Sequence, residues 1–205
     1  LNELGVHFQA NSNEASAAAM LGASINYPLR GAVTWKSTVG TNVASDALSN
    51  LASAGVKGGA LIVLGEDYGE GASIIQERSH AFAMKSQIWL LDPRPNLPQI
   101  VKTVEHGFEL SEQSNSPARL EDRILAWHVH GRFTCNDNRK PLFSRNRVLE
   151  KPDFDYSKIC LPPSTYLQEK QKIEERLPKA VEYIRRHQLK EIFEVNQKQI
   201  GIILQ

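Results

Sequence analysis

The feature that most constrains the fold is a run without charge from Gly59 to Gly65, Gly-Ala-Leu-Ile-Val-Leu-Gly. Its apolar residues do not alternate with polar ones, which is typical of a central parallel strand that is covered by helices on both faces. Neighbouring parallel strands are joined by crossover connections, usually helices. The run therefore predicts a fold of the α/β class.

The surrounding segments supply the strands and helices that such a sheet needs. Strand-like runs occur at residues 6–10, 31–36, 59–65, 88–91 and about 118–128. Helix-like stretches lie between them, at about 14–25, 41–54 and 76–85 and from Asn96 onward. Alternating strands and helices build open sheets of parallel strands. We expect residues 1–131 to form a three-layer α/β domain with a mainly parallel, doubly wound sheet.

The pattern changes after residue 131. Residues 132–163 are polar and aperiodic, which predicts an extended connector. Residues 164–187 are charged with a narrow apolar stripe, which predicts a linker helix bent at Pro178. Residues 132–199 are thus expected to be connector and linker helices. The apolar run at 200–205 is typical of a buried strand, so we interpret the chain as a fragment that lacks its N-terminal start and the domain that this strand begins.

Composition narrows the classes of partner. The net charge of +1 gives no basic field for nucleic acid and no polybasic membrane patch. No apolar run approaches the roughly 20 residues that span a bilayer. The two cysteines, Cys135 and Cys160, are too few for a disulfide framework. We expect a cytoplasmic protein.

Three polar loops are expected at the carboxyl ends of the strands, where ligands bind in open parallel sheets. They are residues 11–14, 36–42 and 66–69. Glu14 begins a helix of very small residues and is the leading catalytic candidate. The alternative from spacing alone is a capping box, with Asn11 as N-cap and Glu14 at N3.

Lys36 and Asn42 are candidates for positioning a substrate carboxylate. The alternatives are a solvated strand end for Lys36 and a first-turn helix position for Asn42. Glycines 69 and 71 lack the spacing of a dinucleotide fingerprint, and no Lys-Ser or Lys-Thr follows them, so dinucleotide and Walker-type sites are excluded.

His128, His130 and Cys135 suggest a metal site at first sight. Two histidines two apart on a strand face the same way, but a third ligand at Cys135 would need a specific turn. The preferred interpretation is a strand end with partly buried imidazoles, and no metal ligands are expected in this chain.

Four stretches in order carry a family resemblance. They are Asn13-Glu14-Ala15 before small residues, the segment from Thr34 to Asp46, the segment from Val56 to Val63, and Gln76-Glu77-Arg78-Ser79-His80. Together they resemble the first domain of 2-oxoacid:ferredoxin oxidoreductases, particularly the larger subunit of the indolepyruvate type, over about residues 5–130. Trp35 and Ser37-Thr38 depart from the family, which has Met and His around Lys36.

The resemblance implies that the domain binds the pyrimidine of thiamine diphosphate. It implies that Glu14 hydrogen-bonds N1′ of the aminopyrimidine and favours the imino tautomer that removes the C2 proton. Asn13, Gly40 and Asn42 would also line the cofactor, and Lys36 and Thr38 would contact the substrate.

The implied reaction is the oxidative decarboxylation of a 2-oxoacid, indolepyruvate or a related aryl oxoacid, to acyl-coenzyme A with electrons passed to ferredoxin. Mg²⁺ and [4Fe–4S] clusters would lie in parts of the enzyme outside this chain, and a second thiamine-diphosphate domain or subunit would be the partner in an oligomer. The chain alone is expected to be inactive. The alternatives are the same domain of another thiamine-diphosphate decarboxylase or synthase, and a non-catalytic module at a subunit interface.

Overall fold

A four-stranded parallel sheet forms the centre of the computed structural model, which describes residues 1–66, 78–137 and 154–190. The strands are β1 (Gly31–Lys36), β2 (Ala60–Glu66), β3 (Trp89–Leu91) and β4 (Ala118–Arg123), in the spatial order β1-β2-β4-β3. All neighbouring pairs are parallel, and the register places Trp35 opposite Leu64 and Leu64 opposite Glu121. The predicted parallel α/β sheet is confirmed for these four strands.

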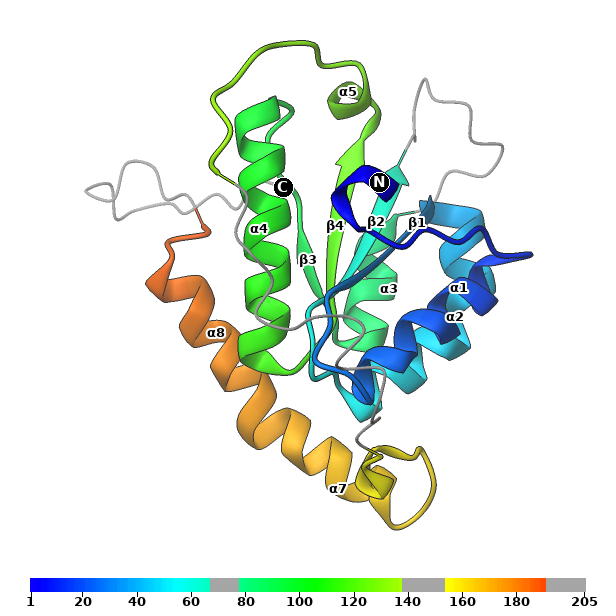
Figure 1. The fold of residues 1–205 in the computed structure, drawn as a ribbon. Coiled ribbons are helices and arrows are strands. Elements are labelled where there is room, and N and C mark those ends of the chain that lie inside the picture. Colours follow the sequence, from blue (N-terminus) through cyan, green and yellow to red (C-terminus); the bar gives the residue numbers. More distant parts are fainter. Residues whose placement is uncertain (67–77, 138–153, 191–205) are drawn as a thin grey trace.

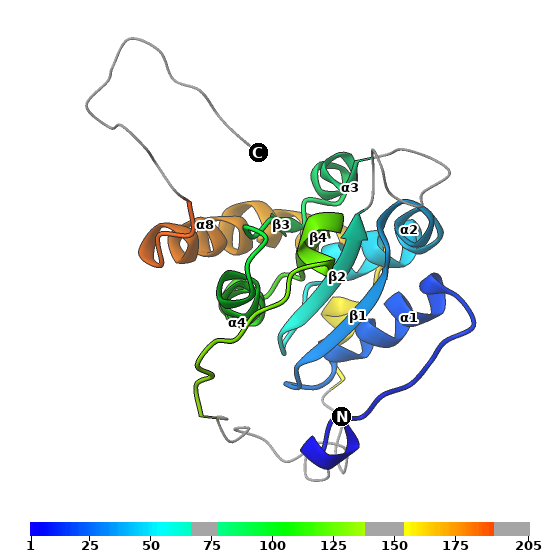
Figure 2. The same ribbon diagram turned by 90° about the horizontal axis from the view of Figure 1, so that it is seen from above.

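Helices cover both faces of the sheet (Figure 2). On one face lie α1 (Glu14–Leu21), α2 (Ser37–Ala54) and α3 (Ser79–Ser86); on the other lies α4 (Leu97–Ser114) with α8 (Leu177–Arg186). The first face buries Ile62 and Leu64, and the second buries Leu61 and Leu120. Successive strand residues point to opposite faces. The apolar run of β2 therefore contributes side chains to both cores, as its lack of alternation predicted.

Short elements and the C-terminal helix complete the described chain. They are η1 (Asn2–Leu4), η2 (Gly22–Ile25), α5 (Ile124–Trp127), η3 (Tyr156–Lys158), α7 (Ser164–Gln171) and the π-helical turn η4 (Lys172–Arg176). From α7 to α8 the chain forms one bent helix that runs beneath the sheet (Figure 1), with α7 against α2 and α8 against α4. None of the described helices is long and apolar enough to cross a membrane.

Two local predictions are confirmed in this framework. Asn96 caps α4 by accepting a hydrogen bond from the backbone of Gln99, and Pro98 lies in the first turn. The predicted bend at Pro178 corresponds to the π turn η4, which directly precedes the turn that holds this proline. Proline has no N–H to donate, and its ring clashes with the carbonyl four residues earlier, so the helix is irregular at this point.

Three boundaries differ from the sequence predictions. Residues 6–10 are not a strand: Val6 and Phe8 are 46% and 67% exposed, and the run forms no ladder with the described strands. With only two large apolar side chains, it gains too little burial to be held against an edge. The strand predicted at about 118–128 ends at Arg123, because Trp127 donates its indole N–H to the carbonyl of Asp122 and the chain folds into α5.

The third difference concerns residues 37–40, which were expected in a loop. They form the first turn of α2, so strand β1 passes into helix at Lys36 without a connection. Gly40 makes this possible, because a Cβ there would lie 2.4 Å from the ring of Trp35. Residues 67–69 of the predicted loop, the start of the predicted helix at 76, the sequence at 138–153 and the predicted strand at 200–205 lie outside the described residues.

Candidate functional site

The carboxyl ends of the strands gather polar side chains at one edge of the sheet. Lys36 ends β1, Glu66 ends β2, Asp92 follows β3 and Arg123 ends β4. Because all four strands are parallel, these residues share the edge at which ligands bind in open sheets. Helices α1 and α2 also begin at this end of the sheet (Figure 1).

A group of carboxylates lies on the face of this edge that α3 covers. We call Glu66, Asp92 and Glu121 the carboxylate cluster. Glu66 is 2% exposed, and its Oε1 accepts a hydrogen bond of 2.9 Å from the backbone N–H of Ser79, at the start of α3. Glu121 is fully buried, and neither of its oxygens has a hydrogen-bond partner among the described residues. Burial, followed by the neighbouring Glu66 carboxyl, raises the pKa of Glu121 to about 9.

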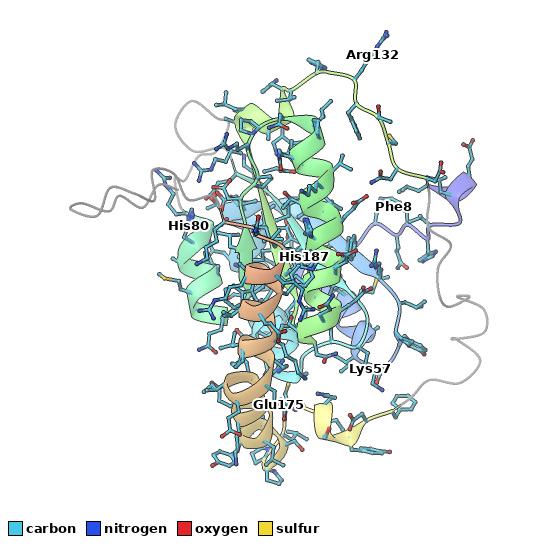
Figure 3. The ribbon with its side chains drawn as sticks, turned by 90° about the vertical axis from the view of Figure 1, so that its left-hand side faces the viewer. Phe8, Lys57, His80, Arg132, Glu175 and His187 are labelled. Carbon is cyan, nitrogen blue, oxygen red and sulfur yellow. The ribbon has the colours of Figure 1, made fainter. Side chains whose placement is uncertain are left out.

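Two further groups border the carboxylate cluster. Arg123 forms an ion pair with Asp92, and its Nε lies 3.6 Å from Oε1 of Glu121. His80 lies at the beginning of α3 (Figure 3). The atoms by which His80, Asp92 and Glu121 can bind a metal lie within 4.8 Å of one another. The cluster thus combines a buried acid, a partly compensating arginine and an imidazole.

A hollow of about 370 Å³ opens beside the ends of β1 and β2. It is lined by Thr34, Trp35, Lys36, Gly65, Glu66, Ile124 and Trp127. Gly65 lies against the indole of Trp127, since a Cβ at residue 65 would be in ordinary contact with that ring at 3.5 Å. The hollow therefore has the ammonium group of Lys36 and the indole ring of Trp127 in its lining, at the carboxyl edge.

The structure makes Asn13 the N-cap of α1 and Glu14 its first residue. The side-chain oxygen of Asn13 accepts a 2.8 Å hydrogen bond from the backbone N–H of Ser16. The capping box with Asn11 as N-cap and Glu14 at N3 is therefore wrong. The Glu14 carboxylate is partly exposed and has no hydrogen-bond or ion-pair partner among the described residues.

The other predicted site residues lie around the start of α2. Lys36 lines the hollow, while Thr38 is 6% exposed and faces inward. Gly40 is buried against Trp35, and the Asn42 side chain donates to the backbone carbonyl of Thr38. Contacts with cofactor or substrate at these four positions stay predictions. For Gly40 the structure also gives a role in packing, and for Asn42 a role in hydrogen bonding within α2.

His128, His130 and Cys135 do not form a buried strand end. The two histidines follow α5 outside any described strand, and all three side chains are exposed. The expectation of partly buried imidazoles is therefore wrong. The two histidines do not lie on a strand end, because β4 already ends at Arg123.

Comparison with known proteins adds to this geometry. The chain resembles the A subunit of indolepyruvate oxidoreductases. It is 28% identical over 146 residues, 69% of its length, to the protein named indolepyruvate oxidoreductase subunit IorA of Methanothermobacter marburgensis. It is 26% identical over 127 residues to the protein of the same name from Pyrococcus horikoshii. These matches take in 23% and 19% of the relatives, so the chain spans about a fifth of the length of the curated relatives it matches. No protein-family model matches the chain.

Sequence reasoning missed most of the carboxylate cluster as a site. Glu66 was noted only as part of a polar loop and His80 only as part of a family motif, and Asp92, Glu121 and Trp127 were given no role. A usable signal was present: Glu121 lies within β4, the last of the described strands, where a charged residue is costly unless it has a partner. That Glu66, Asp92 and Glu121 lie close together is visible only in the structure, because it depends on how β2, β4 and β3 are aligned.

Proposed function

We propose that the described α/β domain is the pyrimidine-binding domain of a thiamine-diphosphate-dependent 2-oxoacid:ferredoxin oxidoreductase, with indolepyruvate or a related aryl oxoacid as substrate. The observation that carries the proposal is the position of Glu14. It begins a small-residue helix at the carboxyl edge of a parallel sheet, and no described residue engages its carboxylate. The similarity to IorA proteins supports this assignment of the domain.

The surroundings of Glu14 support a role in binding the pyrimidine ring. Asn13 provides the cap of α1, so Glu14 is not needed to bind the helix's own backbone N–H groups. The alanines that follow include Ala18, which is fully buried, and their small size lets α1 lie close to α2. Glu14 therefore stands on a rigid support and can hold a proton at N1′ of the pyrimidine.

Thiamine diphosphate, when bound, supplies a nucleophilic carbon and an electron sink for decarboxylation. The chain's part is to orient the pyrimidine through Glu14 and to receive the substrate beside it. Lys36 lies at the rim of the hollow and carries a positive charge suited to the carboxylate of a 2-oxoacid. Trp127 in the same hollow offers an aromatic surface for an aryl side chain.

The proposal assigns the diphosphate, Mg²⁺, iron–sulfur clusters, coenzyme A and ferredoxin sites to a second thiamine-diphosphate domain and to other parts of the enzyme. The partner domain would lie against the carboxyl edge, because Glu14 can reach only a pyrimidine held there. The parallel sheet is common to many α/β proteins, so the fold by itself does not choose this function.

Glu14→Gln in the complete enzyme tests the proposal. We expect turnover to fall by about 10²–10⁴-fold, which is the typical effect of losing a group that acts in proton transfer. The melting temperature should hardly change, because a first-turn carboxylate contributes only about 0.3–1 kcal/mol through the helix dipole. Oxoacid-dependent ferredoxin reduction and thermal unfolding would be measured on the same preparation with saturating cofactor.

Glu105→Gln is the matched control, since Glu105 is an exposed glutamate on α4, in the opposite layer. It should leave turnover unchanged. Near wild-type turnover in Glu14→Gln would reject the cofactor role and favour a non-catalytic module. Decarboxylation that depends on Glu14 but transfers no electrons to ferredoxin would point to another thiamine-diphosphate enzyme.

A further inference from the structure

Three side chains from three separate elements converge at the carboxyl edge. His80 comes from α3, Asp92 follows β3, and Glu121 lies on β4. Their metal-binding atoms all lie within 4.8 Å of one another. In Figure 3, His80 is seen at the end of α3 that lies beside the ends of the strands. One imidazole nitrogen and two carboxylate oxygens are therefore already gathered.

The burial of Glu121 is an independent sign that a cation belongs here. Its side chain is fully buried, and both oxygens lack a hydrogen-bond partner among the described residues. Oε2 of Glu66, next to it, is also buried without one. A buried carboxylate is costly unless it is paired or coordinates a metal. Two carboxyl groups in contact, with three buried oxygens that lack a hydrogen-bond partner among the described residues, add to this cost.

Arg123 compensates the carboxylates of the cluster only in part. Arg123 is shared, because it pairs with Asp92 and reaches Glu121 at 3.6 Å. Arg119 lies two residues earlier on the same face of β4, but its guanidinium has no hydrogen-bond partner among the described residues. A carboxylate has two oxygens, so Asp92 can keep Arg123 and still offer an oxygen to an ion.

We propose that His80, Asp92 and Glu121 bind a divalent transition-metal ion of the Zn²⁺ type, with Glu66 as an acidic neighbour. Imidazole with carboxylates suits such ions better than Mg²⁺ or Ca²⁺, which take oxygen ligands. Ligands at about 2.0–2.1 Å from Zn²⁺ in tetrahedral geometry lie about 3.4 Å apart, so small side-chain rotations complete the site. Three protein ligands leave a fourth position for water or a ligand.

This inference goes beyond the proposed function and departs from the expectation of no metal ligands in the chain. It does not involve Glu14 or thiamine diphosphate, so either proposal can fail while the other holds. The side chain of Asp92 is 26% exposed, which gives the ion a path from solvent.

Direct metal binding to the full chain tests the site. The metal-free chain would be dialysed against ZnCl₂, with MgCl₂ for comparison, and bound metal would be counted by elemental analysis. We expect one Zn²⁺ per chain and no retained Mg²⁺. Zn²⁺ at a hundredfold excess over its dissociation constant should raise the melting temperature by about 5–10 °C, because it binds only the folded state.

Variants decide whether these residues hold the ion. Glu121→Gln and His80→Gln should each weaken Zn²⁺ binding at least tenfold, whereas His128→Gln, which changes an exposed histidine, should not. Circular dichroism would show that each variant is folded; if Glu121→Gln is not, His80→Gln decides alone. A wild-type chain that binds no Zn²⁺ overturns the proposal and leaves a proton shared by Glu66 and Glu121. Binding unchanged in the folded variants overturns it as well.

Discussion

Two regions of the molecule bury an arginine, and they treat its charge in opposite ways. At the amino end of the sheet, Arg176 in η4 is 1% exposed and donates to the backbone carbonyls of Ala52, Ser53 and Gln168. On β4, Arg119 is fully buried, and none of its three nitrogens has a hydrogen-bond partner among the described residues. Burial lowers the pKa of Arg119 to about 10, so its charge persists at neutral pH.

The two arginines differ in whether the buried charge serves as a hydrogen-bond donor to backbone carbonyls that lack one. Ala52 and Ser53 belong to the last turn of α2, whose carbonyls have no partner within the helix. Arg176 supplies that partner from a segment more than 120 residues later. Arg119 satisfies no such group. Burying a charge contributes to stability only where the surrounding polar groups need it.

Among the substitutions that test this comparison, Arg176→Met should lower the free energy of unfolding most. We expect a loss of about 3 kcal/mol in the free energy of unfolding, because hydrogen bonds to a charged group are removed and buried carbonyls lose their donor. Urea unfolding would measure the loss. Lys179→Met, at a half-exposed position on α8, is the control and should change little. A loss below about 1 kcal/mol in Arg176→Met would show that water replaces the arginine without cost.

Gly55→Ala should have the next largest effect, at about 2 kcal/mol. Gly55 has a φ of +76°, and a Cβ would lie 2.6 Å from both Nη1 of Arg176 and the carbonyl oxygen of Asn115. Gly22→Ala is the control, since nothing lies within 4 Å of a Cβ there. Combining Gly55→Ala with Arg176→Met should cost less than the sum of the two, because one clash is gone. Strict additivity would show that Gly55 does not contact the arginine.

Arg119→Met should have the smallest effect and the opposite tendency. An apolar side chain of similar length removes an uncompensated buried charge, so stability should stay within about 1 kcal/mol or rise. The same urea experiment measures it. A loss as large as that of Arg176→Met would mean that Arg119 has a partner outside the described residues, and the contrast between the two arginines would then disappear.

The sequence predicted those parts of the fold that depend on local pattern. The strand at 31–36, the central strand and the helix capped by Asn96 were found because propensity, apolar spacing and capping agreed. The run at 6–10 misled, since strand-like residues form a strand only when an edge and a core are available. Glu14 was correctly placed at a helix start, but the sequence suggested Asn11 as the cap, whereas the backbone angles make Asn13 the cap.

The carboxylate cluster could not be predicted in the same way. Glu66, Asp92 and Glu121 are far apart in sequence, and their meeting depends on β4 lying between β2 and β3. Strand order is a tertiary property that residue pattern does not encode locally. The sequence could have offered only a warning, that Glu121 puts a charge in a buried strand.

The helix from α7 to α8 has a consequence for how the chain acquires its structure. It contacts α2 in one layer and α4 in the other, so it ties together two cores that the sheet keeps apart. Domains begin to fold from the N-terminus while the chain is still being synthesised. The last carbonyls of α2 therefore leave the ribosome long before Arg176 is synthesised. They gain this hydrogen-bond donor only after the helix from α7 to α8 has packed against both layers.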